Sequence, residues 1–145
     1  FSLLNGTVKW KYKGEIIFEI DEEKLKQGSY TGLIRYKDYG IKVNTVKALC
    51  HLPEEEISKE EIFVHSLFEV VDSRTLYLAM AFFLKNKLSR KKSEKIAMMH
   101  DLYTKFNNMM RLLGSKDEKI SIEGLPAFER SDFRRVALMY GVKNV

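Results

Sequence analysis

The sequence predicts an α+β domain in which an antiparallel sheet packs against helices. Period-two alternation of apolar and polar residues marks the start of the chain, and helical three-four spacing marks its later part. No regular strand–helix–strand rhythm joins these parts, which disfavours a parallel α/β sheet. The chain has 145 residues, 45% of them hydrophobic, which suits one core and is too short for two. We therefore expect a single compact domain over residues 1–145.

The first element is a predicted strand. Val8, Trp10 and Tyr12 alternate with lysines, so their apolar face is expected in the core and the lysines in water: Lys9, Lys11 and Lys13. Lys13-Gly14 forms a turn, and residues 15–20 return as a second strand. The pair is a predicted β-hairpin.

The next segments predict one short helix and two more strands. Residues 21–27 suit a short helix with Asp21 as N-cap and Gly28 as its end. Residues 33–37 and 41–52 are expected as strands, and Pro53 closes the second.

Helical signals follow. Ser58-Lys59-Glu60-Glu61 is a capping box that opens a predicted helix through about Val71. Residues 75–84 are β-branched, aromatic and apolar enough for a central strand. A buried helix of the same length stays open as the alternative.

The last third predicts two helices and a short strand. Apolar residues recur at three and four from about Lys91 to Leu113, which predicts one long helix. Ile120 and Ile122 suit a short strand. Ser131 is expected to cap a last helix over residues 132–140, which Gly141 ends.

Composition excludes several classes of protein. The longest apolar run, residues 76–84, is far shorter than the roughly 20 residues of a membrane-spanning helix. Two prolines, eight glycines and 12% aromatic residues exclude collagen-like and disordered chains. The single cysteine, Cys50, has no internal disulfide partner. Because the chain begins with Phe1, we expect an upstream tail to have been trimmed away.

Charge gives the strongest functional signal. The net charge is +5, and residues 85–95 contain six cations against one acid, Glu94, so this segment alone carries the whole excess. The cations are Lys85, Lys87, Arg90, Lys91, Lys92 and Lys95. On an exposed connection they would attract acidic lipid, at about 1 kcal/mol per cation, or RNA phosphates with a strong salt dependence. A solvated linker is the alternative, but cations at a helix N-terminus oppose the helix dipole, which favours an interaction role.

Nothing in the sequence requires an enzyme, a metal or a cofactor. His51, His65 and His100 have no zinc-like spacing, and we expect His65 and His100 at the edge of the core. No phosphate-binding glycine motif is present. The acidic residues at 54–56, 60 and 61 suit a loop and a first helical turn, where they stay solvated. Met98 and Met109 are expected in the core, or in self-association contacts if the long helix exposes them.

Two short segments resemble one protein family. Ser131-Asp132-Phe133-Arg134-Arg135-Val136-Ala137-Leu138-Met139-Tyr140-Gly141 resembles a segment near the end of vesiculovirus matrix proteins. Asn5-Gly6-Thr7-Val8-Lys9 is similar to the opening of the lyssavirus matrix core. The two matches occur in the family's order and cover about a tenth of the chain. The chain thus resembles a divergent rhabdovirus matrix protein, such as that of a plant rhabdovirus.

The resemblance implies a non-enzymatic virion organiser with an α+β fold. Such a protein self-associates, binds the viral nucleocapsid and the acidic inner face of a membrane, and drives assembly and budding. It implies a place in the virion, in the host cytoplasm and at its membranes, and in the host nucleus. The family's lysine-rich N-terminus is absent here, and the family continues beyond the matching helix, so functions of those parts lie outside this sequence.

The basic segment 85–95 is then the expected surface toward lipid or nucleocapsid, with Lys9, Lys11 and Lys13 as a second stripe. Two alternatives use the same segment. One is a non-specific RNA-binding domain, and the other is an adaptor that binds an acidic protein.

Overall fold

Strands β1 (Thr7–Tyr12) and β2 (Glu15–Asp21) form the antiparallel hairpin that the alternation predicts. The structure is a computed structural model and describes residues 6–21 and 27–145. Lys13 and Gly14 make the turn, both with positive φ (48° and 82°), which is the turn geometry that matches the twist of the two strands.

A β-bulge interrupts β1. The register with β2 shifts between Val8 and Trp10, and β1 is an edge strand because the sheet order is β1-β2-β4-β3. The bulge breaks the period-two alternation. Val8 and Tyr12 are 45% and 58% exposed, whereas Trp10 is half-buried. The expected burial of all three on one core face is therefore wrong for Val8 and Tyr12.

Strands β3 (Ser29–Thr31) and β4 (Lys47–Leu52) complete the sheet. Of the segment 41–52 that was predicted as a strand, only the second half is therefore in a strand, β4. The predicted strand over residues 33–37 is wrong, because this segment lies in the 3₁₀ helix η2 (Gly32–Tyr39). Of the predicted helix over residues 21–27, residues 22–26 lie outside the described residues.

The start of η2 explains why residues 33–37 leave the sheet. Gly32 has a φ of 73° and so turns the chain where a side chain would be strained. A Cβ at Gly32 would also clash with Oε1 of Glu69. The same oxygen accepts the Leu33 N–H at 2.8 Å, so the glutamate holds the first turn of η2.

Helix α1 (Lys59–Ser66) begins at the predicted capping box. Ser58 Oγ accepts the Glu61 N–H at 3.2 Å, and Glu61 Oε1 accepts the Ser58 N–H at 3.0 Å. The helix ends earlier than predicted, and the 3₁₀ turn η3 (Leu67–Glu69) follows it.

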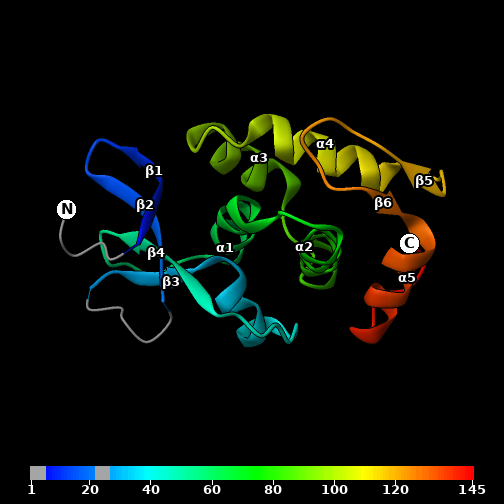
Figure 1. Ribbon diagram of the computed structural model, residues 1–145, viewed down its shortest axis with the longest axis horizontal. Helices are drawn as coiled ribbons and strands as arrows, with labels where there is room; N and C mark the ends of the chain where they lie inside the picture. The colour runs from blue at the N-terminus through cyan, green and yellow to red at the C-terminus, as the bar shows by residue number, and fades with distance from the viewer. Residues whose placement is uncertain (1–5, 22–26) are drawn as a thin grey trace.

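The segment predicted as a central strand is helix α2 (Ser73–Lys85). The strand prediction is therefore wrong, and the buried-helix alternative describes the structure. Residues 75–83 are all buried, which removes the one-sided pattern that separates a helix from a strand. Figure 1 shows α1 and α2 at the centre of the molecule, between the sheet and α5.

Two helices replace the predicted long one. Helix α3 (Arg90–Met99) and helix α4 (Tyr103–Gly114) are separated by residues 100–102, where Asp101 has a φ of 59°. Leu102 is buried at this corner. The three-four spacing continues across the break, which is why the sequence suggests one helix.

The chain ends in a small two-stranded sheet and a last helix. Strands β5 (Lys119–Ile120) and β6 (Phe128–Glu129) pair antiparallel, so Ile120 is in the predicted strand and Ile122 is not. Helix α5 (Arg130–Met139) starts from Glu129 rather than from Ser131, and Gly141 follows it with a φ of 80°.

The main hydrophobic core lies among η2, α1, α2, α4 and α5. At its centre the rings of Tyr36 and Phe82 stack with centroids 4.1 Å apart. A smaller cluster that includes Phe18 and Cys50 lies on the sheet. The strands β1–β4 gather at one end of the molecule and α5 lies at the other (Figure 1), which gives one compact α+β domain as predicted. Within the described ranges, no helix has the length and apolar character needed to span a membrane.

Candidate functional site

The six cations of residues 85–95 all lie on the surface where α2 ends and α3 begins. Lys85 is the last residue of α2, Lys87 is in the connection, and the other four are in α3. All six side chains are exposed, as predicted. The structure therefore gathers them on one connection and the first two turns of one helix.

Two of these six cations are already bound to the protein. Lys85 Nζ donates to the Tyr140 main-chain oxygen at 2.8 Å and so ties α2 to α5. Lys92 Nζ lies 3.4 Å from Glu60 Oε1, while Glu60 Oε2 accepts the Ser89 N–H at 3.2 Å. Burial raises the pKa of Glu60, but these contacts outweigh it and leave the pKa below its usual value. Lys85 and Lys92 therefore have structural roles.

The other four cations form what we call the open basic patch: Lys87, Arg90, Lys91 and Lys95. Within the described part of the chain, no carboxylate lies at ion-pair distance from any of them. Arg90 and Lys91 also lie in the first turn of α3, which contains no acid. Cations there oppose the helix dipole by about 0.3–1 kcal/mol each. An external anion would remove this conflict.

One face of α3 combines cations with exposed methionines. Lys91 and Lys95 are four residues apart, and Met98 and Met99 continue the same side one turn later. These methionines are 59% and 66% exposed, whereas Ser93 on the opposite side is fully buried. The expected place of Met98 in the core is therefore wrong, and its exposure meets the condition for a self-association role, which stays a prediction. Met109 is fully buried in the core of α4, as expected of a core residue, so the exposure on which its self-association role depends is not met.

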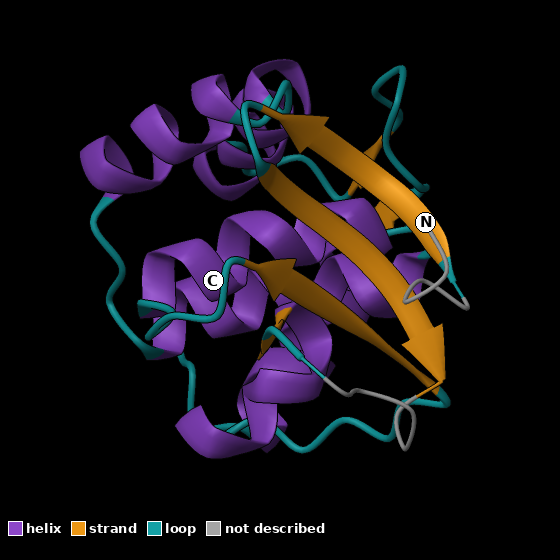
Figure 2. Ribbon diagram, turned by 90° about the vertical axis from the view of Figure 1, so that its left-hand side faces the viewer, coloured by secondary structure: helices purple, strands orange, loops and turns teal. Residues whose placement is uncertain are grey.

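The second basic stripe is exposed on β1 and its turn, as expected for Lys9, Lys11 and Lys13. The Trp10 ring contacts the ring of His100, with centroids 4.4 Å apart, and His100 directly follows α3. The hairpin therefore lies beside the end of α3 that presents Met98 and Met99, and Figure 2 shows the sheet standing next to the helices.

The structure also brings together a cluster that the sequence analysis misses, and we call it the histidine cluster: Glu15, His51, His65 and His100. Its members come from β2, β4, α1 and the end of α3. The rings of His51 and His65 have centroids 5.8 Å apart, and those of His65 and His100 4.9 Å apart. Period-two alternation predicts only which residues share one face of a strand. The pairing of the strands and the positions of the helices are also needed to find this cluster.

Each ring in the histidine cluster is fixed through Nδ1. His51 Nδ1 lies 2.9 Å from the Pro53 carbonyl oxygen, and His100 Nδ1 lies 2.9 Å from that of Ile96. The Nε2 atoms of the same rings lie 3.4 Å and 2.8 Å from Glu15 Oε1. The carboxylate of Glu15 therefore lies between the ring of His51 from β4 and the ring of His100 from the end of α3.

His65 is the most deeply buried member. Its Nδ1 lies 2.7 Å from the Thr31 hydroxyl, and its Nε2 is buried without a hydrogen-bond partner. Burial, followed by the nearby His100 and His51, holds the pKa of His65 well below its usual value. His65 is therefore neutral in the folded protein at neutral pH.

Two further kinds of chemical group are the Cys50 thiol and the side chains that can ligate a metal. Burial, and then the charge of Glu69, raise the pKa of the Cys50 thiol to about 12, so little thiolate is present at neutral pH. Across residues 6–21 and 27–145, no group of three or more His, Cys, Asp or Glu side chains has an arrangement that would hold a metal ion.

Comparison with protein-family models, curated proteins and solved structures finds no match to this chain. The functional argument therefore depends on the surface and the clusters described above.

Proposed function

We propose that this chain is the core of a non-enzymatic viral matrix protein of the rhabdovirus type. In this proposal it binds the acidic inner face of a membrane, self-associates there, binds the nucleocapsid, and drives virion assembly and budding. The virion and the host cytoplasm, membrane and nucleus are its proposed locations.

The face of α3 is the observation that carries the proposal. Lys91 and Lys95 present positive charge, and Met98 and Met99 present apolar side chains on the same side of the helix. An interfacial helix binds through this combination of electrostatic attraction and shallow apolar insertion. A surface that bound only RNA phosphates would have no need of two exposed methionines.

The open basic patch sets the expected strength of binding. Each cation near an acidic membrane contributes about 1 kcal/mol, so its four members together contribute about 4 kcal/mol. Exposed charges are screened by salt, with a Debye length of about 8 Å at physiological ionic strength. Membrane binding should therefore weaken steeply as salt is raised.

The hairpin supports a second contact beside the first. Lys11 and Lys13 are exposed near Tyr12, whose ring lies 5.3 Å from Lys13 Nζ. Because the Trp10 and His100 rings hold the hairpin against the end of α3, two basic surfaces lie on adjoining elements. Such a surface can contact lipid with one part and a second copy or the nucleocapsid with the other.

Vesicle flotation tests the proposal. The chain is mixed with neutral vesicles and with vesicles containing phosphatidylserine, in salt from about 50 to about 500 mM. We expect flotation only with the acidic vesicles and at the lower salt concentrations. Replacing the open basic patch by Gln should lower the partition constant by up to about three orders of magnitude. Met98→Ser with Met99→Ser should weaken flotation and leave its salt dependence unchanged.

A matched control removes the same charge elsewhere. Lys37, Lys42, Lys47 and Lys119 are exposed lysines outside α3 and β1, and their replacement by Gln should leave flotation nearly unchanged. If both quadruple variants lose flotation equally, only net charge matters and the proposed surface is wrong. If the intact chain does not float but binds RNA, with a salt slope that the open basic patch sets, the RNA-binding alternative replaces the membrane proposal.

A further inference from the structure

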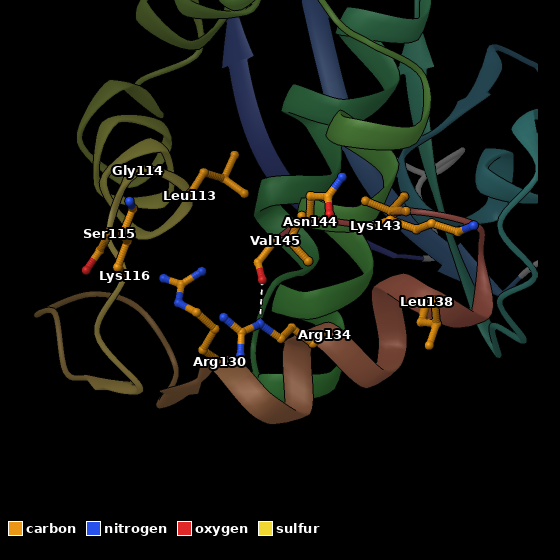
Figure 3. A pocket seen from close by; sticks show the side chains of 11 residues that line it. Leu113, Gly114, Ser115, Lys116, Arg130, Arg134, Leu138, Lys143, Asn144 and Val145 are labelled. Carbon is orange, nitrogen blue, oxygen red and sulfur yellow. Dashed lines mark hydrogen bonds between the residues drawn. The ribbon is translucent and has the colours of Figure 1, made fainter.

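A pocket of about 560 Å³ lies at the end of the molecule opposite the sheet. It is formed by the end of α4, the start of α5 and residues 142–145 (Figure 3). Its volume lies within the range of about 300–1,000 Å³ that is typical of small-molecule sites. The pocket lies away from the α3 face, and its occupant is independent of the function proposed above.

The lining of the pocket is strongly basic. Lys116, Arg130, Arg134 and Lys143 contribute to it, and none of its lining residues is an Asp or a Glu. The guanidinium groups of Arg130 and Arg134 lie near each other on one side, and Lys116 and Lys143 lie at opposite edges (Figure 3). The pocket therefore presents two planar cations, and its lining residues include no Asp or Glu side chain.

Arg130 is held rigidly in this arrangement. It is only 4% exposed, its Nε donates to the Asp117 main-chain oxygen at 3.1 Å, and its Nη2 donates to that of Leu112 at 2.9 Å. Its guanidinium carbon lies 4.9 Å from the centre of the Phe128 ring. Within the described part of the chain, Nη1 has no hydrogen-bond partner besides these contacts of the other two nitrogens.

Arg134 lies one helical turn later on the same side of α5. Its Nε donates to the main-chain oxygen of Val145, and among residues 6–21 and 27–145 neither terminal nitrogen has a hydrogen-bond partner. Burial, and then the charge of Arg134, lower the pKa of Arg130, against the opposing effect of Glu118 and Asp117. The Glu118 carboxylate is directed to the Ser131 N–H, at 3.1 and 3.2 Å from its two oxygens, and so does not pair with either arginine.

We propose that this pocket binds a phosphate monoester, with the phosphoryl group on Arg130 and Arg134. Planar guanidinium forks match phosphate oxygens in paired hydrogen bonds, and a dianion offsets the repulsion between the two arginines. The pocket is larger than a phosphate group alone. Leu113, Leu138 and Val142 supply apolar lining for the organic part of the ligand.

The ligand can come from solution or from a lipid headgroup, and two arms of one experiment separate these sources. Isothermal titration calorimetry uses inositol 1,4-bisphosphate and inorganic phosphate as soluble probes. Flotation uses vesicles with phosphatidylinositol 4-phosphate, compared with phosphatidylserine vesicles of equal charge, which lack a phosphate monoester. Saturable binding in either arm, or in both, supports the site. The arm in which it occurs shows whether the ligand comes from solution or from a lipid headgroup. Absence of binding in both arms overturns the proposal.

The variants test the position of the site. Arg134→Gln should weaken binding by about 10- to 100-fold, and Arg134→Lys should recover only part of the loss because a lysine cannot form the paired contact. Arg135→Gln is the matched control, because Arg135 is the next residue of α5, is exposed and pairs with Asp132 at 3.2 Å. Equal losses in Arg134→Gln and Arg135→Gln would show general charge attraction and overturn the site. Arg130 stays unchanged in these tests because its hydrogen bonds also hold α4 and α5 together.

Discussion

His100 Nε2 lies 2.8 Å from Glu15 Oε1, across 85 positions of the chain. This contact joins the end of α3 to the start of β2, and the Trp10 ring packs on the same histidine. The two basic surfaces of the molecule therefore keep a fixed relative position through one histidine–carboxylate contact. The helix break comes after this residue, because the His100 N–H still donates to the Ile96 main-chain oxygen at 3.2 Å and the positive φ of 59° is at Asp101.

Acid should destabilise the fold through His65. The unfolded chain titrates this side chain near pH 6.5, whereas burial holds its folded pKa well below that value. The unfolded state then binds more protons below about pH 6.5, so stability falls as the pH drops from there. One proton changes the free energy of unfolding by at most about 1.4 kcal/mol per pH unit.

Urea unfolding of His65→Gln between about pH 7 and pH 5 checks this expectation. The variant should be less stable at pH 7 but should lose stability more slowly as the pH falls. Thr31→Val is the control, because it removes the 2.7 Å contact with the ring and keeps the histidine. Parallel pH profiles of the free energy of unfolding for the wild type and His65→Gln would show that His65 does not cause the loss of stability in acid. Glu15, Glu55, His51 and His100 face the same cluster and stay unchanged in both variants.

Glu69 should act in the opposite direction. Burial raises the pKa of this half-buried carboxyl from 4.5 to about 8, the nearby Glu19 raises it further, and the Leu33 N–H and Lys9 lower it. A folded pKa above the unfolded one gives stability that is complete below about 4.5 and is lost as the pH rises toward 8. Stability should therefore decline across the neutral range.

Glu69→Gln should remove this decline. In the wild type, Glu69 Oε1 accepts the Leu33 N–H at 2.8 Å. The amide oxygen of a Gln at this position can still accept it, so the first turn of η2 keeps its contact. We expect a flatter free energy of unfolding between about pH 6.5 and pH 8 by urea titration, the range in which His65 no longer adds a slope of opposite sign. An unchanged slope would mean that Glu69 titrates normally. Glu123→Gln, at an exposed loop position, is the control and should leave the profile as it is.

Helix α2 should depend on its N-terminal cap. Asp72 Oδ1 accepts the Thr75 N–H at 2.8 Å, and Thr75 Oγ1 accepts the Asp72 N–H at 3.2 Å. Asp72→Ala should cost about 1 kcal/mol, or about 2–4 °C in Tm for a chain of this length. Asp72→Asn keeps a capping oxygen and should lose only a small part of this. Thermal unfolding measures both, and an Asp72→Ala variant with unchanged Tm would show that packing alone holds α2.

The same cap shows where the sequence was informative and where it misled. The Ser58 box and the Lys13-Gly14 turn are local signals, and both elements form as predicted. Asp72 and Thr75 provide a comparable local signal for α2, but the apolar run behind them suits a strand equally well. Local capping chemistry was the better guide there, because burial on all sides removes the periodicity.

Long-range contacts account for the other differences. The start of η2 depends on Glu69, which is 36 positions from Leu33 in the chain, so it does not follow from nearby residues. The six cations were predicted from charge counting alone. Which of them are open was not, because Glu60 and Tyr140 engage two of them from distant elements.

Lys105 should be worth more to stability than an ordinary surface lysine. Its Nζ donates to the Leu67 oxygen at 2.6 Å and to the Val70 oxygen at 3.0 Å, which joins α4 to the end of η3. Burial lowers the pKa of this ammonium, so it lies in a partly desolvated position. Lys105→Met keeps the length of the side chain and removes the donor.

Loss of that donor leaves two carbonyl oxygens without their partner, at a cost of about 1–3 kcal/mol. Lys119→Met, at an exposed position in β5, is the matched control and should change stability by no more than about 0.5 kcal/mol. Urea unfolding at pH 7 compares the two variants with the wild type. If Lys105→Met were as stable as Lys119→Met, water would be replacing the ammonium at both oxygens, and η3 would not depend on α4 for its position.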